Sequence, residues 1–191
     1  MRYYCVFLLF MSLALISCSS SVEQTTEDEP QMVELPDGSV ALLNVHSSIT
    51  YHPDFEDRTI SQEGEVFYVV VEDEVPFVIE TEQGDVKVVG TEFNVKAIGA
   101  ELEVEVERGV VQLKTSKLFK EIRKGQRALF KDVSKGIQMG KAEFYHRKWS
   151  KHFDKQLRMF RKDLKKGTRK AGKDSKKIGK DLNKEFKKLG K

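Results

Sequence analysis

The sequence predicts an all-β domain of short antiparallel strands, arranged as a sandwich or jelly roll and followed by a long amphipathic α-helical tail. From residue 33 to about residue 133 the apolar residues recur with period two, the spacing of strands that face a core on one side. Turn signals such as Asp37-Gly38 and Gly84-Asp85 separate these short runs. No long helical pattern precedes residue 140. Strands at this spacing are typical of sandwiches and barrels.

The clearest strand is residues 101–107, in which glutamate alternates with an aliphatic residue. Arg108-Gly109 then turns the chain into a second apolar run at 110–113, as a tight hairpin does. A ladder of glutamates could suggest calcium or carbohydrate chemistry. Because alternation places all four on one side of a strand, we interpret them as a solvated face.

The N-terminus has the features of a bacterial lipoprotein signal. An apolar run at 6–16 is too short to span a bilayer, which takes about 20 residues, but suits a signal-peptide core. It ends in Leu-Ile-Ser-Cys, which resembles the lipobox. We therefore predict a signal peptide at 1–17 and lipidation of Cys18, with the protein anchored in the cell envelope, at the outer membrane facing the periplasm. Cys5 would be removed with the signal, which leaves no disulfide or cysteine-based metal site.

Residues 18–32 are rich in Ser, Thr, Glu and Asp, a composition that favours an acidic tether. The β domain is predicted at 33–135 and a basic helix at 141–191. Charge divides the same way: 141–191 hold 20 Lys and Arg against 6 Asp and Glu, a net of +14, whereas 18–140 hold 12 against 24, a net of −12. Such asymmetry predicts an interaction tail.

The tail repeats with a period of 11 residues, which keeps its apolar positions on one side of a nearly straight helix. Three interpretations remain open: the helix lies on an anionic membrane or on lipopolysaccharide phosphates, it packs on a protein partner or on the acidic β domain of its own chain, or it is a solvated charge run. The residues predicted to contact a membrane or polyanion are Trp149, Phe153, Leu157, Phe160, Leu164, Ile178, Leu182, Phe186, Leu189, Lys165, Lys166, Lys176, Lys177, Lys187 and Lys188.

Six segments in order resemble the periplasmic domain of the FecR family. They are Leu-Pro-Asp-Gly-Ser (35–39), Leu-Asn (43–44), Ser-Ile-Thr-Tyr (48–51), Gly-Glu-Val-Phe-Tyr (64–68), Pro-Phe (76–77) and Gly-Thr-Glu-Phe-Asn-Val (90–95). The hairpin at 104–113 and Lys-Gly-Gln-Arg-Ala (124–128) fit the closing strands of that family. The resemblance covers about 100 residues. It implies a bend at Gly90, whose backbone freedom would turn a corner, and an Asn94 that satisfies nearby backbone groups.

FecR-like proteins regulate sigma factors through a cytoplasmic segment, one transmembrane helix and this β domain, which is often followed by a receptor-facing module. Here the long apolar segment is the signal, and a lysine-rich tail follows the domain. The resemblance therefore implies a protein-interaction or sensor domain in envelope or TonB-receptor signalling, without its own anti-sigma segment. Its expected partner is a receptor or a FecR-type regulator. The alternative is a structural envelope protein whose tail binds an anionic surface or polymer.

Enzyme motifs are missing from the sequence. The four histidines do not form a metal-binding helix spacing, and there is no nucleophile elbow, phosphate loop or dinucleotide fingerprint. His46 and His52 are predicted to be surface residues. We predict no enzyme activity, no cofactor and no metal, and we do not expect nucleic acid as a partner because a lipoprotein signal places the chain outside the cytoplasm.

Overall fold

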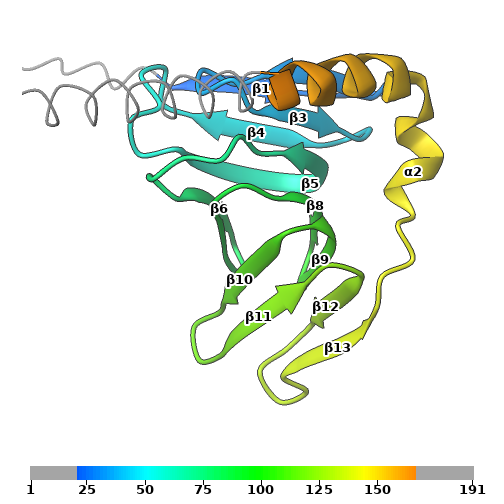
Figure 1. The fold of residues 1–191 in the computed structure, drawn as a ribbon. Helices are drawn as coiled ribbons and strands as arrows, with labels where there is room; N and C mark the ends of the chain where they lie inside the picture. Colours follow the sequence, from blue (N-terminus) through cyan, green and yellow to red (C-terminus); the bar gives the residue numbers. More distant parts are fainter. Residues whose placement is uncertain (1–20, 167–191) are drawn as a thin grey trace, which may run out of the picture.

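The computed structural model describes residues 21–166, which form a 13-stranded sheet followed by a helical segment (Figure 1). The strands are β1 (Val22–Thr25), β2 (Gln31–Glu34), β3 (Val40–Leu43), β4 (Ser48–Tyr51), β5 (Thr59–Val69), β6 (Phe77–Thr81), β7 (Gly84–Val88), β8 (Glu92–Ile98), β9 (Glu101–Arg108), β10 (Val110–Lys114), β11 (Phe119–Arg123), β12 (Gln126–Phe130) and β13 (Ile137–Lys141). The helical segment comprises α2 (His146–Trp149), the 3-10 turn η1 (Ser150–Phe153) and helical residues 154–166. The predicted all-β class is confirmed, whereas a long helical tail is shown only as far as residue 166.

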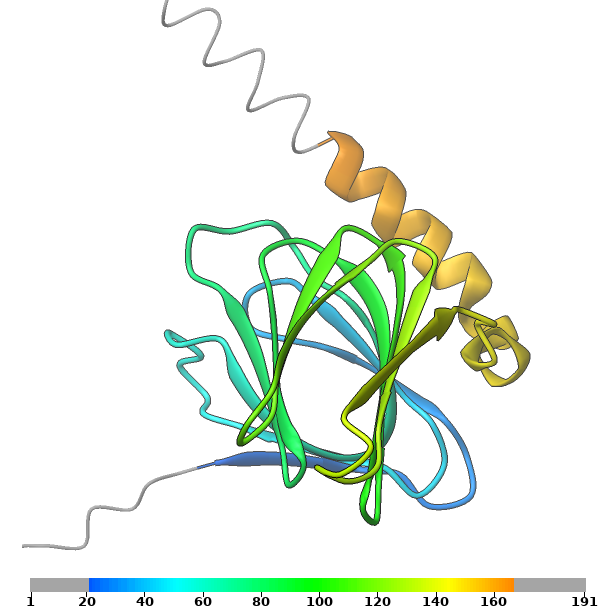
Figure 2. The same cartoon turned by 90° about the horizontal axis from the view of Figure 1, so that it is seen from below.

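Strand β5 joins the two halves of the sheet. Its first part pairs with β4 and β6 in sheet A, which runs β1-β4-β5-β6-β7-β10-β11. Its second part pairs with β3 and β8 in sheet B, which runs β2-β3-β5-β8-β9-β12-β13. The pairing of β5 with β6 is parallel, and the other pairings among the described strands are antiparallel. Seen end on, the sheet curls into a nearly closed barrel (Figure 2).

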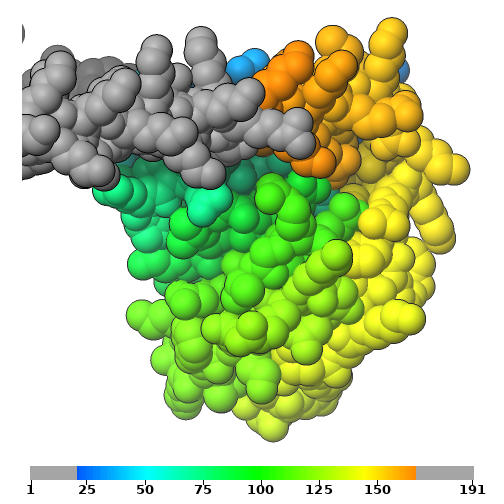
Figure 3. Space-filling view, in the orientation of Figure 1, coloured from blue at the N-terminus to red at the C-terminus, as the bar shows by residue number. Residues whose placement is uncertain are grey.

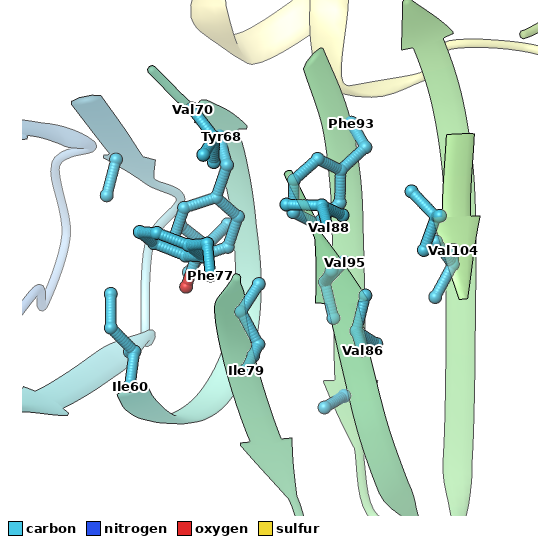
Figure 4. Packing of buried hydrophobic residues seen from close by; sticks show 14 of the residues in the cluster. Ile60, Tyr68, Val70, Phe77, Ile79, Val86, Val88, Phe93, Val95 and Val104 are labelled. Atoms are coloured by element: carbon cyan, nitrogen blue, oxygen red, sulfur yellow. The ribbon is translucent and has the colours of Figure 1, made fainter. Parts of the chain in front are cut away.

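Aromatic side chains from three strands fill the middle of the barrel (Figure 4). The ring of Tyr68 stacks on Phe93 at 5.4 Å between centroids and meets Phe77 edge-on at 5.8 Å. The Tyr68 hydroxyl donates to Gln62 Oε1 at 2.9 Å, so the one polar atom of this ring is satisfied inside the core. Burial raises the pKa of Tyr68 well above its usual range.

The Leu-Pro-Asp-Gly-Ser turn has a structural role. Asp37 accepts the Ser39 amide at 2.8 Å and the Ser39 hydroxyl at 2.7 Å, while Gly38 takes φ +78° at the apex. The same carboxylate holds the buried Arg58, whose Nη2 and Nε lie 2.6 and 2.9 Å from Asp37 Oδ2. Arg58 also donates to the carbonyls of Val71 and Val75. One buried ion pair therefore ties three loops together.

Gly90 lies at the corner where the chain passes from β7 in sheet A to β8 in sheet B, as the sequence predicts. The reason differs from the predicted one, because Gly90 is not among the residues with positive φ. A Cβ at Gly90 would lie 2.8 Å from Glu72 Cβ and 2.9 Å from Glu72 Cα. The glycine is needed because the 71–76 loop passes too close for a side chain.

Gly90→Ala should therefore lower the free energy of unfolding by about 1–3 kcal/mol, the usual cost of overpacking. Gly140→Ala is the matched control, because a Cβ there meets nothing within 4 Å and the φ is not positive. Urea denaturation of both variants measures the difference. Equal stability of the two variants would contradict a steric role for Gly90.

The N-terminal segment differs from the predicted acidic tether over 18–32. Strand β1 pairs with β4 from Val22 onward, and β2 pairs with β3. The hydroxyl of the buried Thr26 donates to the Asn44 carbonyl and accepts the Ser47 amide at 3.0 Å. The composition suggested a tether because these edge strands bury few side chains, but their main chains complete the sheet. Strands thus extend from Val22 to Lys141, beyond the predicted limits of 33–135.

Within residues 21–166, no helix combines the length and the apolar character needed to cross a bilayer.

Candidate interaction face

The outer face of sheet B is apolar where β3 and β5 lie side by side. All four residues of β3 and the last four of β5 are buried, so both faces of these strands are covered. Val40, Leu42, Phe67 and Val69 point away from the barrel interior and form a second cluster, which we call the outer cluster. Each is at most 1% exposed. Another part of the chain must therefore lie on this face.

Residues 143–166, here called the covering segment, lie on the outer cluster. Phe153 and Leu157 are buried against it, and Met32 and Phe160 pack at its margin. The helix runs along one flank of the barrel in Figure 2, and the segment wraps over the domain surface in Figure 3. The spacing of these contacts is that of one face of an amphipathic helix.

Glutamates of β9 hold the start of the covering segment. Glu105 is 1% exposed, and its Oε1 accepts the main-chain amides of Glu143 at 2.7 Å and Phe144 at 3.2 Å. A buried carboxylate that receives two amides is satisfied without a cation. This contact fixes where the chain leaves β13 and turns onto the face.

The next glutamate along β9, Glu107, binds two side chains of α2. His146 Nε2 lies 3.2 Å and Arg147 Nε 2.7 Å from Glu107 Oε1. Burial by itself would raise the pKa of Glu107, but the hydrogen bonds from His146 and Arg147 outweigh it and lower the pKa to about 2. The His146 ring is 2% exposed and stacks on Phe67 with 4.3 Å between centroids.

A third acidic contact lies further along the helix. Arg161 Nη2 is 2.7 Å and Nε 3.0 Å from Glu92 Oε2, and Arg108 Nε donates to the other oxygen of Glu92 at 2.9 Å. Glu92 is 8% exposed, so this carboxylate is desolvated and paired on both sides. Glu92, Glu105 and Glu107 therefore form an acidic rim beside the outer cluster.

The prediction that Glu101, Glu103, Glu105 and Glu107 form a solvated face is thus wrong for most of these residues. Glu105 is buried and Glu107 is 13% exposed, because the covering segment lies over them. Glu103 pairs with Arg127, and burial raises the pKa of Glu103 in spite of that arginine. Glu101 alone of the four is half exposed, in a pair with Lys131. Alternation identified the common face correctly but could not show what covers it.

The predicted tail residues divide between this face and the part of the chain beyond residue 166. Phe153 and Leu157 are buried, and Trp149, Phe160 and Leu164 are partly buried, all against the outer cluster. Their contact with a membrane stays a prediction, and with the helix in this position these side chains face the sheet. The positions that lie outside the described residues are Cys18, Lys176, Lys177, Ile178, Leu182, Phe186, Lys187, Lys188 and Leu189.

Lys165 and Lys166 lie on another side of the helix. They line a groove of about 460 Å³ together with Arg158, Arg161 and Lys162, a set with a helical repeat. The covering segment therefore has an apolar side on the sheet and a cationic side along the groove. The basic amphipathic helix predicted over 141–191 stays a prediction.

Sequence reasoning did not find His146, Arg161, Glu92 or the outer cluster. A signal was present in the continuous apolar runs of β3 and β5, VALL and VFYV, which are typical of strands buried on both faces. The partners across the face are separated by up to 69 residues in sequence, which no local pattern reports. His46 and His52 are exposed, as predicted.

The low pKa of Glu107 predicts an acid-sensitive contact. A carboxylate whose pKa falls from 4.5 to about 2 on folding stabilises the docked segment fully above pH 4.5, and this stabilisation is lost as the pH falls toward 2. Trp149 is the single tryptophan and lies at the interface, so its fluorescence reports docking. Glu107→Gln should weaken docking at neutral pH and flatten the acid transition. Glu101→Gln, on the same strand but exposed, should leave the transition unchanged; if the two behave alike, Glu107 does not anchor the segment.

A second hollow of about 980 Å³ is lined by residues of β4, β5, β6 and β8 and of the turns beside them. Its lining includes the acidic residues Glu63, Glu80 and Glu82 and the cationic Lys96 among polar and apolar neighbours. No three side chains of the metal-binding types gather anywhere in the part of the chain that the structure describes. The absence of enzyme activity and of a cofactor stays a prediction.

Comparisons with known proteins found one family model and solved structures of similar fold. A protein-family model described as FecR protein matches residues 21–112. Two crystal structures of a candidate anti-sigma factor from Parabacteroides distasonis, at 2.50 and 1.65 Å resolution, are similar to this chain. The first has a TM-score of 0.60 and 30% sequence identity, and the match covers 64% of this chain and 60% of that one. The second has a TM-score of 0.59 and 30% sequence identity, and the match covers 63% of this chain and 59% of that one. The chain therefore spans about three fifths of the solved structures that it matches. No curated protein matches it.

The fold and the covered face define a β domain that binds a helical segment on the outside of its sheet. The match of the FecR model to residues 21–112 confirms the resemblance seen in the sequence. The matched region contains the outer cluster and the acidic residues that rim it, whereas the covering segment lies beyond it.

Proposed function

We propose that this chain is an envelope lipoprotein whose FecR-like domain binds a protein partner in envelope signalling, without a cytoplasmic anti-sigma segment of its own. The observation that carries the proposal is the FecR match together with 30% identity to a candidate anti-sigma factor of the same fold. The partner class is a TonB-dependent receptor or a FecR-type regulator. The domain would act as an interaction or sensor module at the membrane surface.

Lipidation of Cys18 would hold the domain close to its membrane. Four residue steps separate Cys18 from Val22, where β1 begins, a reach of at most about 14 Å. Anchored proteins with long linkers sample a wide volume, but this connection is short. A partner in the same membrane would therefore meet the domain at high effective concentration.

In-cell crosslinking followed by mass spectrometry tests the proposal. We would compare the full chain, a chain that ends at residue 166, and a Phe93→Asp chain, in which a carboxylate at a fully buried core position should unfold the domain while the tail is intact. Capture of the same receptor or regulator by the first two chains and not by the third supports recognition by the β domain. Capture that follows the tail instead would overturn it.

A second candidate is a structural role in which the basic tail binds an anionic membrane surface, lipopolysaccharide or another polymer. It is favoured by the cationic groove along the helix, which includes Arg158 and Lys162. A Cys18→Ser chain should bind vesicles with anionic lipid and be released by moderate salt. Arg158→Glu with Lys162→Glu should weaken that binding, whereas Lys117→Glu with Lys120→Glu on the β domain should not.

A further inference from the structure

The covering segment has a strained residue near its start. Phe144 has φ +54°, a left-handed conformation that is costly for a bulky side chain. It stands in the short connection between β13, which ends at Lys141, and α2, which begins at His146. A more extended backbone at Phe144 would release this strain and would carry the segment away from its own domain.

The interface of the covering segment also contains buried polar atoms that lack partners among the described residues. They are Asn94 Oδ1 on β8, and His146 Nδ1 and Trp149 Nε1 on α2. Asn94 is 3% exposed and is the register partner of Phe67, on which His146 stacks. Its amide donates to Glu65 Oε1 rather than to the backbone, which differs from the predicted role. Unsatisfied polar atoms weaken an interface, so the segment is held less firmly than its apolar contacts alone suggest.

The negative charges beside the outer cluster are complementary to the positive charges of the covering segment. The rim contributes the carboxylates of Glu92 and Glu107, and the segment contributes Arg147 and Arg161. The covering segment is joined to the β domain only through the short connection between β13 and α2. Its arginines can therefore form the same ion pairs with the glutamates of another copy. The apolar contacts of Leu157 with the outer cluster transfer in the same way.

We propose that the outer face of sheet B accepts the covering segment of a second copy of this chain, so that two copies exchange residues 145–166 by pivoting at Phe144. The exchanged dimer keeps every contact between segment and face and relieves the strained backbone at the pivot. Exchange of an identical element is a common route to dimers, and short strained hinges promote it. The proposal does not depend on the signalling partner.

Cysteine pairing between two copies of the full chain tests the exchange. In a Cys5→Ser, Cys18→Ser background, one copy carries Glu92→Cys and a second, longer-tagged copy carries Arg161→Cys. The two are refolded together and oxidised. We expect a disulfide between copies, in a fraction that rises with protein concentration.

The matched control pairs Glu101→Cys in one copy with Lys131→Cys in the other, because this contact joins β9 to the residue that follows β12 within one domain and is not exchanged. Little crosslinking between copies is expected there. The proposal is overturned if both pairs crosslink equally, if neither does, or if a chain with both Glu92→Cys and Arg161→Cys links only to itself at every concentration.

The pivot has its own test. Glycine adopts a positive φ without strain, so Phe144→Gly should favour the closed monomer and reduce the dimer fraction several-fold in sedimentation velocity. Tyr145→Gly is the control, since Tyr145 is exposed and has an ordinary φ of −59°. A dimer fraction that responds equally to both changes would show that strain at Phe144 does not drive exchange.

Discussion

Replacing Arg58 with alanine should lower the free energy of unfolding by about 3–5 kcal/mol, the cost of leaving one member of a buried ion pair without its partner. Arg58 is 4% exposed and makes hydrogen bonds to Asp37, Val71 and Val75. Its removal leaves the Asp37 carboxylate desolvated and two main-chain carbonyls without their donor. The variant would also lose the side chain that links the turn at 35–39, the loop at 71–76 and the start of β5.

Urea denaturation followed by circular dichroism measures this loss. Lys131→Ala is the matched control, because it breaks an ion pair with Glu101 in which both side chains are about half exposed. Exposed pairs contribute about 0–1 kcal/mol, so this variant should remain close to the parent. An Arg58→Ala chain that is as stable as the Lys131→Ala chain would show that the buried pair is not what holds the loops.

Strand positions could be predicted from the sequence because their signal is local. Alternation at 101–107 and the Arg108-Gly109 turn place β9 and β10 within a residue of their observed limits. The Leu-Pro-Asp-Gly-Ser motif was visible as a family signature. Its physical reason was not, because the Arg58 that completes it lies 21 residues further on and joins it only in the folded chain.

The candidate face could not be predicted because it depends on which surface the helix covers. The 11-residue repeat showed that residues 153, 157, 160 and 164 share one side of a helix, and the charge division allowed the acidic domain as one of three partners. Periodicity reports that an apolar side exists and not what it contacts. The N-terminal strands were missed for a related reason, since main-chain pairing of β1 with β4 leaves little trace in the composition.

Leu157→Asp should detach the covering segment while the barrel stays folded. Leu157 is 3% exposed on the outer cluster, and burial of a leucine side chain contributes about 1.5–3 kcal/mol. Placing a carboxylate there adds a desolvation cost beside an already acidic rim. The inner core is a separate cluster that includes Tyr68 and Phe93, so it should be retained.

Limited trypsin digestion measures this detachment, because the segment carries Arg147, Arg158 and Arg161 as cleavage sites. Loss of 1.4 kcal/mol of docking free energy changes the open population tenfold, so cleavage should accelerate by at least about tenfold. Met159→Asp changes a residue on the same helix that is 59% exposed and should leave the rate unaltered.

The comparison of the two variants shows whether the covering segment opens independently of the barrel or unfolds together with it. If Leu157→Asp accelerates cleavage of the segment but leaves the urea midpoint of the barrel in place, the outer face of sheet B is a docking site that opens on its own. If Leu157→Asp lowers the urea midpoint and also accelerates cleavage, the covering segment and the barrel unfold as one cooperative unit. Only in the first case does the chain hold a closed binding face whose occupant can be replaced, because opening then costs less than global unfolding.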